Sequence, residues 1–270
     1  MATMQQVVDV TALSLDGSSI LGAFANATLT MPNDLVNAKP ASRNGMRNSV
    51  AKKSWSLSTE LMSVVSGSRK VQHTDISVFT LDGVDYLGIF NGTLTGTITQ
   101  VEGSLSGSKW KDPQNTDIDF GFSGKVLVPT ATGGAQALLS DAASSTLTDA
   151  EMVVSFTLNG IAVTLPMTLA SVSLGLQSGG LQEISIELSG NSPDSGAYPT
   201  APTGTSSLLE KAFNSYKTAI TFAMTTHATE GGAFSGSAKL KSYSIGMNDG
   251  QLVNVQYNYE GSGALTFTPN

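Results

Sequence analysis

The chain has no cysteine and only two histidines among its 270 residues. The absence of cysteine excludes disulfides and thiolate metal ligands, and two histidines are too few for a histidine-rich metal centre. No run of about 18 apolar residues occurs, which excludes a membrane-spanning helix. The first residues show no basic segment followed by an apolar one, so we expect a protein that is not exported through a signal peptide.

Charged residues are scarce, at 13% of the chain, and the net charge is −7. Because contacts to phosphates require Lys and Arg, an acidic chain of this kind is poorly suited to bind nucleic acid. Many of the basic residues cluster at Lys39, Arg43, Arg47, Lys52, Lys53, Arg69 and Lys70. Such a cluster is typical of a solvated loop, or of an arm that contacts an acidic partner such as another copy of the chain.

A repeat divides the sequence into two halves. Asp112–Gly124 aligns with Asp249–Gly261 at a constant offset of 137, and both segments alternate polar with large apolar residues before a glycine. A self-match at a fixed offset indicates a repeated structural unit. We therefore predict one domain over residues 1–130, a linker over 131–148 and a second domain over 149–270.

Strand patterns dominate both halves. Asp16-Gly17, Asp82-Gly83 and Asn159-Gly160 each separate two apolar-polar alternating segments. These dipeptides favour the type I′ turns of antiparallel hairpins. Further strands are predicted at 53–61, 183–188, 217–226, 234–245 and the two repeated segments. The fold class is therefore mainly β, as two tandem β-sandwich or half-barrel domains with at most one short helix each.

Two other features interrupt the strands. Residues 206–215 have the spacing and N-cap of a short helix, and residues 136–145 are a weaker candidate. Residues 32–52 and 191–204 are long and rich in turn formers, and we expect loops there. The first of these would form an arm that leaves the sheet after the opening hairpin.

The candidate catalytic motifs in the sequence are incomplete. We therefore expect a protein that is not an enzyme and needs no cofactor or metal. Gly103–Gly107 has Leu105 where a hydrolase elbow requires serine, and Ser49–Lys52 lacks the companion motifs of a serine-lysine enzyme. Asp117 and Asp119 could be a carboxylate pair. Their counterparts in the second half are Asn254 and Gln256, so the repeat preserves polarity on one strand face.

The order of elements resembles the tail tube proteins of long-tailed bacteriophages. The likeness rests on the opening hairpin at 10–17, the Trp-bearing segment 50–61, and segments 234–239 and 255–263 near the end of the chain. The family usually has a helix after the Trp-bearing strand, and residues 62–75 show no such pattern.

The resemblance implies a structural virion protein whose copies form rings that stack into a tube. Two domains per chain imply a trimeric, pseudo-hexameric ring, with sheets around a channel through which DNA passes without specific binding. It implies that Lys39, Arg43, Arg47 and Lys52 lie on an arm contacting the adjacent ring, and we take the polar pairs Asp117/Asp119 and Asn254/Gln256 as channel-lining candidates.

Expected partners are other copies of the chain, a tape-measure protein and tail-completion proteins, without membrane insertion. The protein would be located in the virion tail, and in the host cytoplasm during assembly. Two alternatives stay open on the same residues: another β-rich virion component, such as a tail-tip, spike or capsid-decoration protein, and the tube protein of a contractile injection system.

Overall fold

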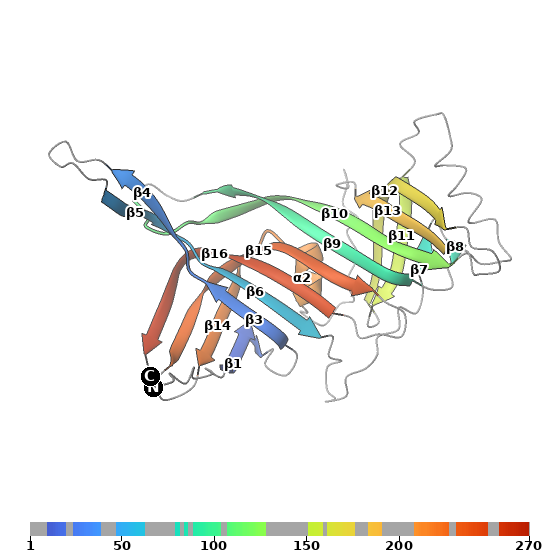
Figure 1. The fold of residues 1–270 in the computed structure, drawn as a ribbon. Helices are drawn as coiled ribbons and strands as arrows, with labels where there is room; N and C mark the ends of the chain where they lie inside the picture. Colours follow the sequence, from blue (N-terminus) through green and yellow to red (C-terminus); the bar gives the residue numbers. More distant parts are fainter. Residues whose placement is uncertain are drawn as a thin grey trace, which may run out of the picture.

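The computed structural model describes residues 10–19, 24–38, 47–62, 79–81, 84–85, 89–103, 107–127, 151–158, 161–175, 183–190, 208–226, 231–247 and 254–269. These residues form a 14-stranded antiparallel sheet, a separate two-stranded sheet and one short helix (Figure 1). The fold class predicted from the sequence, mainly β, is confirmed.

The strands range from two to 16 residues in length. The first half contains β1 (Val10–Leu15), β2 (Ser18–Ser19), β3 (Phe24–Thr30), β4 (Asn33–Ala38), β5 (Arg47–Lys53), β6 (Ser56–Met62), β7 (Phe79–Leu81), β8 (Val84–Asp85), β9 (Ile89–Glu102) and β10 (Pro113–Leu127). The second half contains β11 (Glu151–Leu158), β12 (Ile161–Gly175), β13 (Glu183–Gly190), helix α2 (Leu208–Asn214), β14 (Ile220–Thr226), β15 (Gly232–Met247) and β16 (Asn254–Pro269).

Period-two alternation produces the buried face. In β13, Ile184, Ile186 and Leu188 are buried while the residues between them are exposed or half-buried. Because successive side chains of a strand point to opposite faces, such alternation places one face on the core and the other in water. The predicted short helix is confirmed as α2, and its Phe213 packs on Phe120 of β10 and Tyr243 of β15.

The hairpins follow the predicted dipeptides. Asp16 and Gly17 have φ of 53° and 76°, as the type I′ turn requires, and they join β1 to β2. β7 pairs with β8 around residues 82–83, and β11 pairs with β12 up to Leu158 opposite Ile161. The strands directly after the first two turns, β2 and β8, are only two residues long. The longer strands expected to complete these hairpins pair elsewhere: β3 pairs with β6, and β9 pairs with β10 and β15.

Strand pairing crosses between the two halves. β1, β3 and β6 join a group with β14, β15 and β16, through the pairs β1·β14 and β6·β16. β7, β9 and β10 join a second group with β11, β12 and β13, through β7·β11 and β10·β13. We call these the first module and the second module. Figure 1 shows the first module on the left and β11–β13 with β7 on the right, with β9 and β10 spanning between them.

Each module contains three strands from each half. We match β1, β3, β6, β7, β9 and β10 in order with β11, β12, β13, β14, β15 and β16. The pairs β1·β14, β15·β16, β6·β16 and β3·β6 of the first module then correspond to β7·β11, β9·β10, β10·β13 and β12·β13 of the second. The predicted linker 131–148 lies outside the described residues. The division into domains 1–130 and 149–270 stays a prediction, and the hydrogen-bonded groups combine strands from both sides of it.

The two modules meet where β9 pairs with β15. Gly96 lies directly opposite Tyr243 in this ladder. On its other side Gly96 lies opposite Phe120, and Tyr243 lies opposite Tyr257. Phe120 and Tyr257 are equivalent in the repeat, at the offset of 137. Equivalent positions therefore face each other, and the two modules are related locally by a two-fold arrangement at this seam.

The segment 32–52 differs from the predicted loop. Most of it forms the hairpin β4·β5, a two-stranded sheet separate from the main one, which points away from the body at the upper left of Figure 1. The loop prediction was wrong for β4 and β5, because these segments pair through a backbone ladder. Where exposure is described, at residues 33, 34 and 50–53, no side chain is buried, so the alternation that marks a half-buried strand is absent there.

Candidate functional surface

One face of the main sheet carries only polar side chains along rows that cross several strands. Residues paired directly across an antiparallel ladder point to the same face. One such row consists of Thr28, Ser58, Asn258, Ser242, Thr97 and Asp119, from β3 through β6, β16, β15 and β9 to β10. All six are exposed or half-buried. We call this surface the polar face.

Neighbouring rows have the same character. One consists of Asn26, Glu60, Gln256, Ser244, Thr95, Gly121 and Ser189. Another consists of Asn254, Gly246, Thr93, Ser123, Glu187 and Ser171. The polar face thus continues across the seam between the modules, and its members are hydroxyl, amide, carboxylate and glycine residues.

Hydrogen bonds between the short side chains link neighbouring strands within these rows. Ser58 Oγ donates to Asn258 Oδ1 over 2.8 Å, and Asn258 Nδ2 donates to Ser242 Oγ over 3.0 Å. Ser171 Oγ donates to a Glu187 carboxylate oxygen over 3.0 Å. These bonds hold the side chains close to the sheet, so the face presents short, mutually bonded groups.

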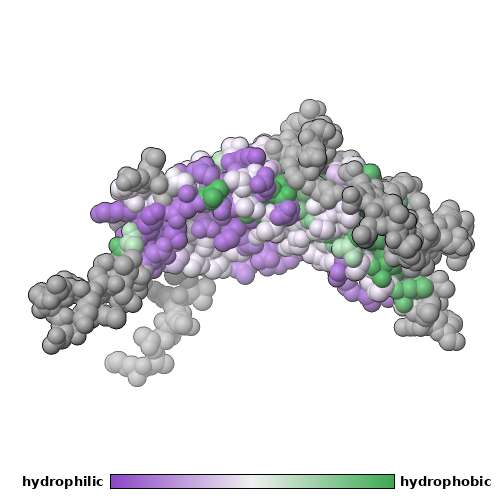
Figure 2. Space-filling view, turned by 90° about the horizontal axis from the view of Figure 1, so that it is seen from above, coloured by the Kyte–Doolittle hydropathy of each residue, from purple (hydrophilic) through white to green (hydrophobic). Residues whose placement is uncertain are grey.

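The charge of the polar face is predominantly negative. Glu60, Asp117, Asp119 and Glu187 lie on it. Lys125 of β10 follows in the same alternation, and its Nζ lies 3.2 Å from a Glu183 carboxylate oxygen. Figure 2, seen from above, shows mainly hydrophilic and neutral residues over the middle of the molecule, with small separate hydrophobic spots.

The four predicted channel-lining residues all lie on exposed positions. Asp117 and Asp119 are on β10, and Asn254 and Gln256 are on β16, with β9 and β15 between them. Three inter-strand spacings separate the two pairs, which is roughly 14 Å. Asn254 Nδ2 donates to Glu60 Oε1. The structure therefore places both pairs on one face, while their role as a channel lining stays a prediction.

Sequence reasoning missed Glu60 and Glu187. Each lies in a strand whose alternation was recognised, and the signal was the polar phase of that alternation. The neighbouring strands could not be predicted from the sequence, since β6 pairs with β16 from the other half and β13 pairs with β10.

The opposite face of the same strands is a core of aromatic side chains. Tyr243, Tyr257 and Tyr259 are buried, and Tyr257 lies 6.5 Å from Tyr243 and 6.1 Å from Tyr259 between ring centroids. Burial raises the pKa of all three phenols above its ordinary value, because the ionised form would lose its hydration. The hydroxyl of Tyr243 has no hydrogen-bond partner in the part of the chain that the structure describes.

Thr59 Oγ1 likewise lacks a partner among the described residues, whereas the other buried polar groups near the seam are bonded. The Asn115 side-chain amide donates to the carbonyl oxygens of Tyr216 and Leu240, the latter over 2.9 Å. Its oxygen accepts from Gln100 Nε2 over 2.8 Å. Lys239 Nζ donates to Gln114 Oε1 over 2.6 Å. This network ties β9, β10 and β15 together beneath the polar face.

The arm is anchored at its base. Lys53 N donates to Lys109 O over 2.7 Å, and Lys111 N donates to Lys53 O over 3.0 Å. Lys111 Nζ lies 2.8 Å from Asp34 Oδ2, and Lys52 pairs with Glu102. The hydrogen bond to Asp34 and the attraction of nearby carboxylates raise the pKa of Lys111, against a smaller opposing effect of burial. The arm is thus tied to the β9–β10 connection by backbone and charge.

The predicted arm residues divide into two groups. Lys39 and Arg43 lie outside the described residues. Arg47 begins β5, and Lys52 lies near its end, where its side chain forms an ion pair with Glu102.

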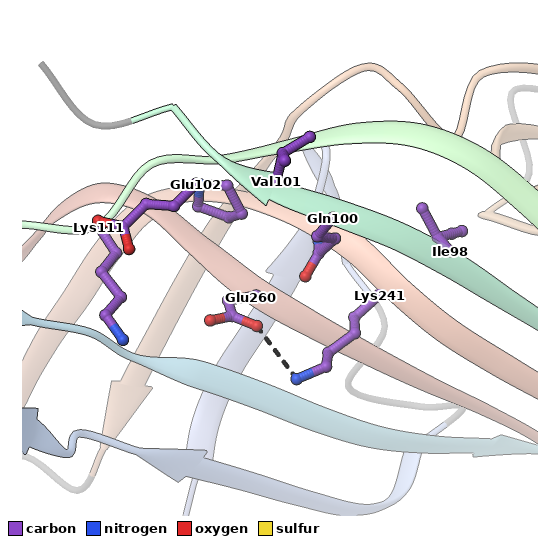
Figure 3. A pocket seen from close by; sticks show the side chains of 8 residues that line it. Ile98, Gln100, Val101, Glu102, Lys111, Lys241 and Glu260 are labelled. Atoms are coloured by element: carbon purple, nitrogen blue, oxygen red, sulfur yellow. Dashed lines mark hydrogen bonds and ion pairs between the residues drawn. The ribbon is translucent and has the colours of Figure 1, made fainter.

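A hollow of about 330 Å³ lies beside the arm base (Figure 3). Its wall includes Ile98, Val101 and Pro113 and four charged residues: Glu102, Lys111, Lys241 and Glu260. Lys241 Nζ and a Glu260 carboxylate oxygen lie 3.2 Å apart, and Figure 3 shows this pair joined by a dashed line. Each of these charges has an opposite partner, so the charges that line the hollow sum to zero and do not favour a ligand of either sign.

Two further kinds of site are absent from the described ranges. No group of three or more His, Cys, Asp or Glu residues there is arranged to hold a metal ion. No helix among those residues is long and apolar enough to cross a membrane. The motif Ser49–Lys52 lies within β5, and residues 104–106 between Gly103 and Gly107 are outside the described part.

Comparison with known proteins gives no family for this chain. No protein-family model matches it, and no curated protein matches its sequence.

Proposed function

We propose that the protein is a structural virion protein whose copies assemble into rings that stack into a phage tail tube, the conduit for DNA ejection. The observation that supports this best is the polar face. It combines short hydroxyl and amide groups with Glu60, Asp117, Asp119 and Glu187, and its neighbouring Lys125 is paired with Glu183.

Such a face suits a wall along which DNA slides. Cationic side chains would bind phosphates by releasing counterions, and each such contact would slow movement. A surface of negative potential repels phosphates and keeps the duplex hydrated. Short side chains bonded to one another offer few groups that could reach out to bases.

The ring would contain six modules from three chains. The seam at β9·β15 is two-fold and is complete within one chain, so it does not itself propagate a ring. Contacts between chains would have to use other strand edges. The arm β4·β5, with its basic residues, would contact the acidic surface of the next ring, where opposite charge favours docking.

Electron microscopy of the purified protein at high concentration tests this proposal. We expect hollow tubes of uniform diameter with an axial repeat of stacked rings. Isolated rings capping a larger assembly would favour a tail-tip or decoration protein, and tubes that recruit a contractile sheath protein would favour an injection system. Neither outcome fits the tail tube proposed here.

The charge of the polar face can be tested separately. We expect Asp117→Lys with Asp119→Lys to leave tube formation intact and to slow DNA ejection from particles that carry the variant, because two cations per chain would now face the duplex. Asp117→Asn with Asp119→Asn is the matched control, since it reproduces the polarity of the second half. Unchanged ejection kinetics in the Lys variant would place these residues away from the channel.

A further inference from the structure

The two ends of the molecule carry opposite charge. The strands β7, β8, β11, β12 and β13 contain no Lys, Arg or His and four carboxylates: Asp85, Glu151, Glu183 and Glu187. The arm strands β4 and β5, with the segment 107–112 that anchors them, contain five basic residues and two carboxylates: Arg47, Lys52, Lys53, Lys109, Lys111, Asp34 and Asp112. Figure 1 shows the arm at the upper left and β7, β8 and β11–β13 at the right.

Two lysines at the basic end have no carboxylate partner in the described part of the chain. Lys53 and Lys109 are both exposed, and neither forms an ion pair with another described residue. They are neighbours, because Lys53 N donates to Lys109 O over 2.7 Å. Their ammonium groups can therefore bind a carboxylate of another molecule without giving up a bond within this one.

Apolar side chains lie beside these lysines. Trp110 is half-buried, and Lys53 Nζ lies 5.7 Å from its ring centroid. Met31 is 52% exposed and precedes Pro32, whose carbonyl oxygen accepts a hydrogen bond from the backbone next to Lys53. A tryptophan flanked by cations and an exposed methionine is a composition typical of protein interfaces. We call Met31, Lys53, Lys109 and Trp110 the arm-base surface.

The outer face of the hairpin β11·β12 is complementary to the arm-base surface. Val153 is 40% exposed there and lies opposite Pro166. Glu151 lies two residues before Val153 and thus on the same face of β11. Asp85 of β8 lies in the same cross-strand row as Ser155 of β11, with β7 between them. This face therefore combines two carboxylate positions with an exposed apolar pair, where the arm-base surface combines two lysines with apolar side chains.

We propose that the arm-base surface docks on the outer face of β11·β12 of a second copy of this chain. Opposite charge at the two ends attracts copies head to tail, and docking buries the exposed apolar side chains of both surfaces. Because the contact joins two different surfaces, it can close into a ring or continue from one ring to the next. The inference rests on the proposed self-assembly and names the acidic surface that the arm region contacts there.

Charge reversal tests the arm-base surface in the intact chain. Lys53→Glu should weaken association at least about tenfold in sedimentation velocity at low ionic strength, because it places like charges together. Lys217→Glu is the matched control, since Lys217 is also exposed and its Nζ also lies 5.7 Å from a ring centroid, that of Tyr216. The control should associate within about twofold of the unchanged chain, because isolated surface charges contribute little.

A compensating reversal tests the partner surface. Glu151→Lys alone should weaken association, since it brings a lysine to the arm-base lysines. The chain that carries both Lys53→Glu and Glu151→Lys should recover to within about threefold of the unchanged chain, because the pair then attracts with opposite polarity. Circular dichroism checks that each variant is folded.

Tryptophan quenching tests the same contact without a substitution. The chain has two tryptophans, and Trp55 is 1% exposed, so acrylamide reaches mainly Trp110. We expect quenching by acrylamide to fall at least about twofold on association, since a docked interface excludes solvent from its centre.

Several outcomes overturn the inference. Lys53→Glu that associates as strongly as Lys217→Glu, or a chain that stays monomeric at low ionic strength, would exclude the arm-base surface as a contact. Weakening without recovery in the double variant would mean that it meets another surface, and unchanged quenching would mean that it stays open when copies associate. Normal tubes from Lys53→Glu would contradict the docking and leave the tube proposal standing, whereas compensated association that never gives tubes would do the reverse.

Discussion

Gly96→Ala tests the seam that joins the two modules. A Cβ at this position would lie 2.2 Å from Cε1 and 2.5 Å from Cζ of Tyr243. The Tyr243 ring has little room to move, since it is buried and contacts Phe213 edge-on at 5.3 Å between centroids. Overpacking a filled core in this way costs about 1–3 kcal/mol of unfolding free energy.

Gly246→Ala is the matched control in the same ladder. Gly246 lies opposite Thr93 of β9, and a Cβ there would meet nothing closer than Asn254 O at 3.7 Å. That is ordinary contact, so we expect a change within about 0.5 kcal/mol. The loss of conformational freedom in the unfolded chain would even favour the alanine variant slightly.

Urea unfolding followed by tryptophan fluorescence measures both variants. A loss of 1–3 kcal/mol corresponds to roughly 2–12 °C in melting temperature for a chain of this size class. Combining Gly96→Ala with Tyr243→Ala should be less destabilising than the sum of the single changes, because the second removes the obstructing ring. If Gly96→Ala is as stable as Gly246→Ala, the Tyr243 ring does not lie on Gly96 and the pairing of β9 with β15 is refuted.

Three further predictions follow from the core and the arm. Tyr243→Phe should raise the unfolding free energy by about 1 kcal/mol, because it removes a buried hydroxyl without a described partner; a loss in urea titration would show that the hydroxyl is bonded. The raised pKa values of Tyr243, Tyr257 and Tyr259 mean that the folded state retains phenol protons which the unfolded state releases above about pH 10. The contribution of these phenols to stability is therefore constant below that pH and is lost above it, by up to roughly 1.4 kcal/mol per pH unit for each tyrosine. Absorbance at alkaline pH should show these phenols ionising only with unfolding, and ionisation in the folded state would contradict their burial. Replacing residues 35–51 by Asn-Gly, which joins the cross-strand partners Asp34 and Lys52, should yield rings or monomers but no long tubes, whereas normal tubes in micrographs would exclude the arm as the contact between rings.

The sequence was sufficient to predict individual strands and their faces. The alternation in 112–124 and 249–261 placed Ile118, Phe120 and Phe122 on one side of a strand, and all three are buried. The Asp16-Gly17 turn could be predicted because both positions need positive φ, which this dipeptide tolerates. These features depend on residues close together in the chain.

Strand neighbours could not be predicted. Alternation determines which face of a strand is buried, but several apolar strands offer equivalent edges, and the choice between them depends on the whole core. The pairing of β6 with β16 brings Ser58 beside Asn258, which are 200 residues apart. For this reason Asp117, Asp119, Asn254 and Gln256 could be selected from the sequence, whereas the continuous polar face that contains them could not.

Labelling of Gln256→Cys in assembled and unassembled protein tests the central claim, that the polar face forms the channel wall. The cysteine would be the only thiol in the chain, and Gln256 is exposed on β16. We expect a polymer-conjugated maleimide to react with the free protein and to be excluded from assembled tubes, while a small maleimide reacts with both. Equal reaction of the bulky reagent before and after assembly would place this face on the outside and contradict the account.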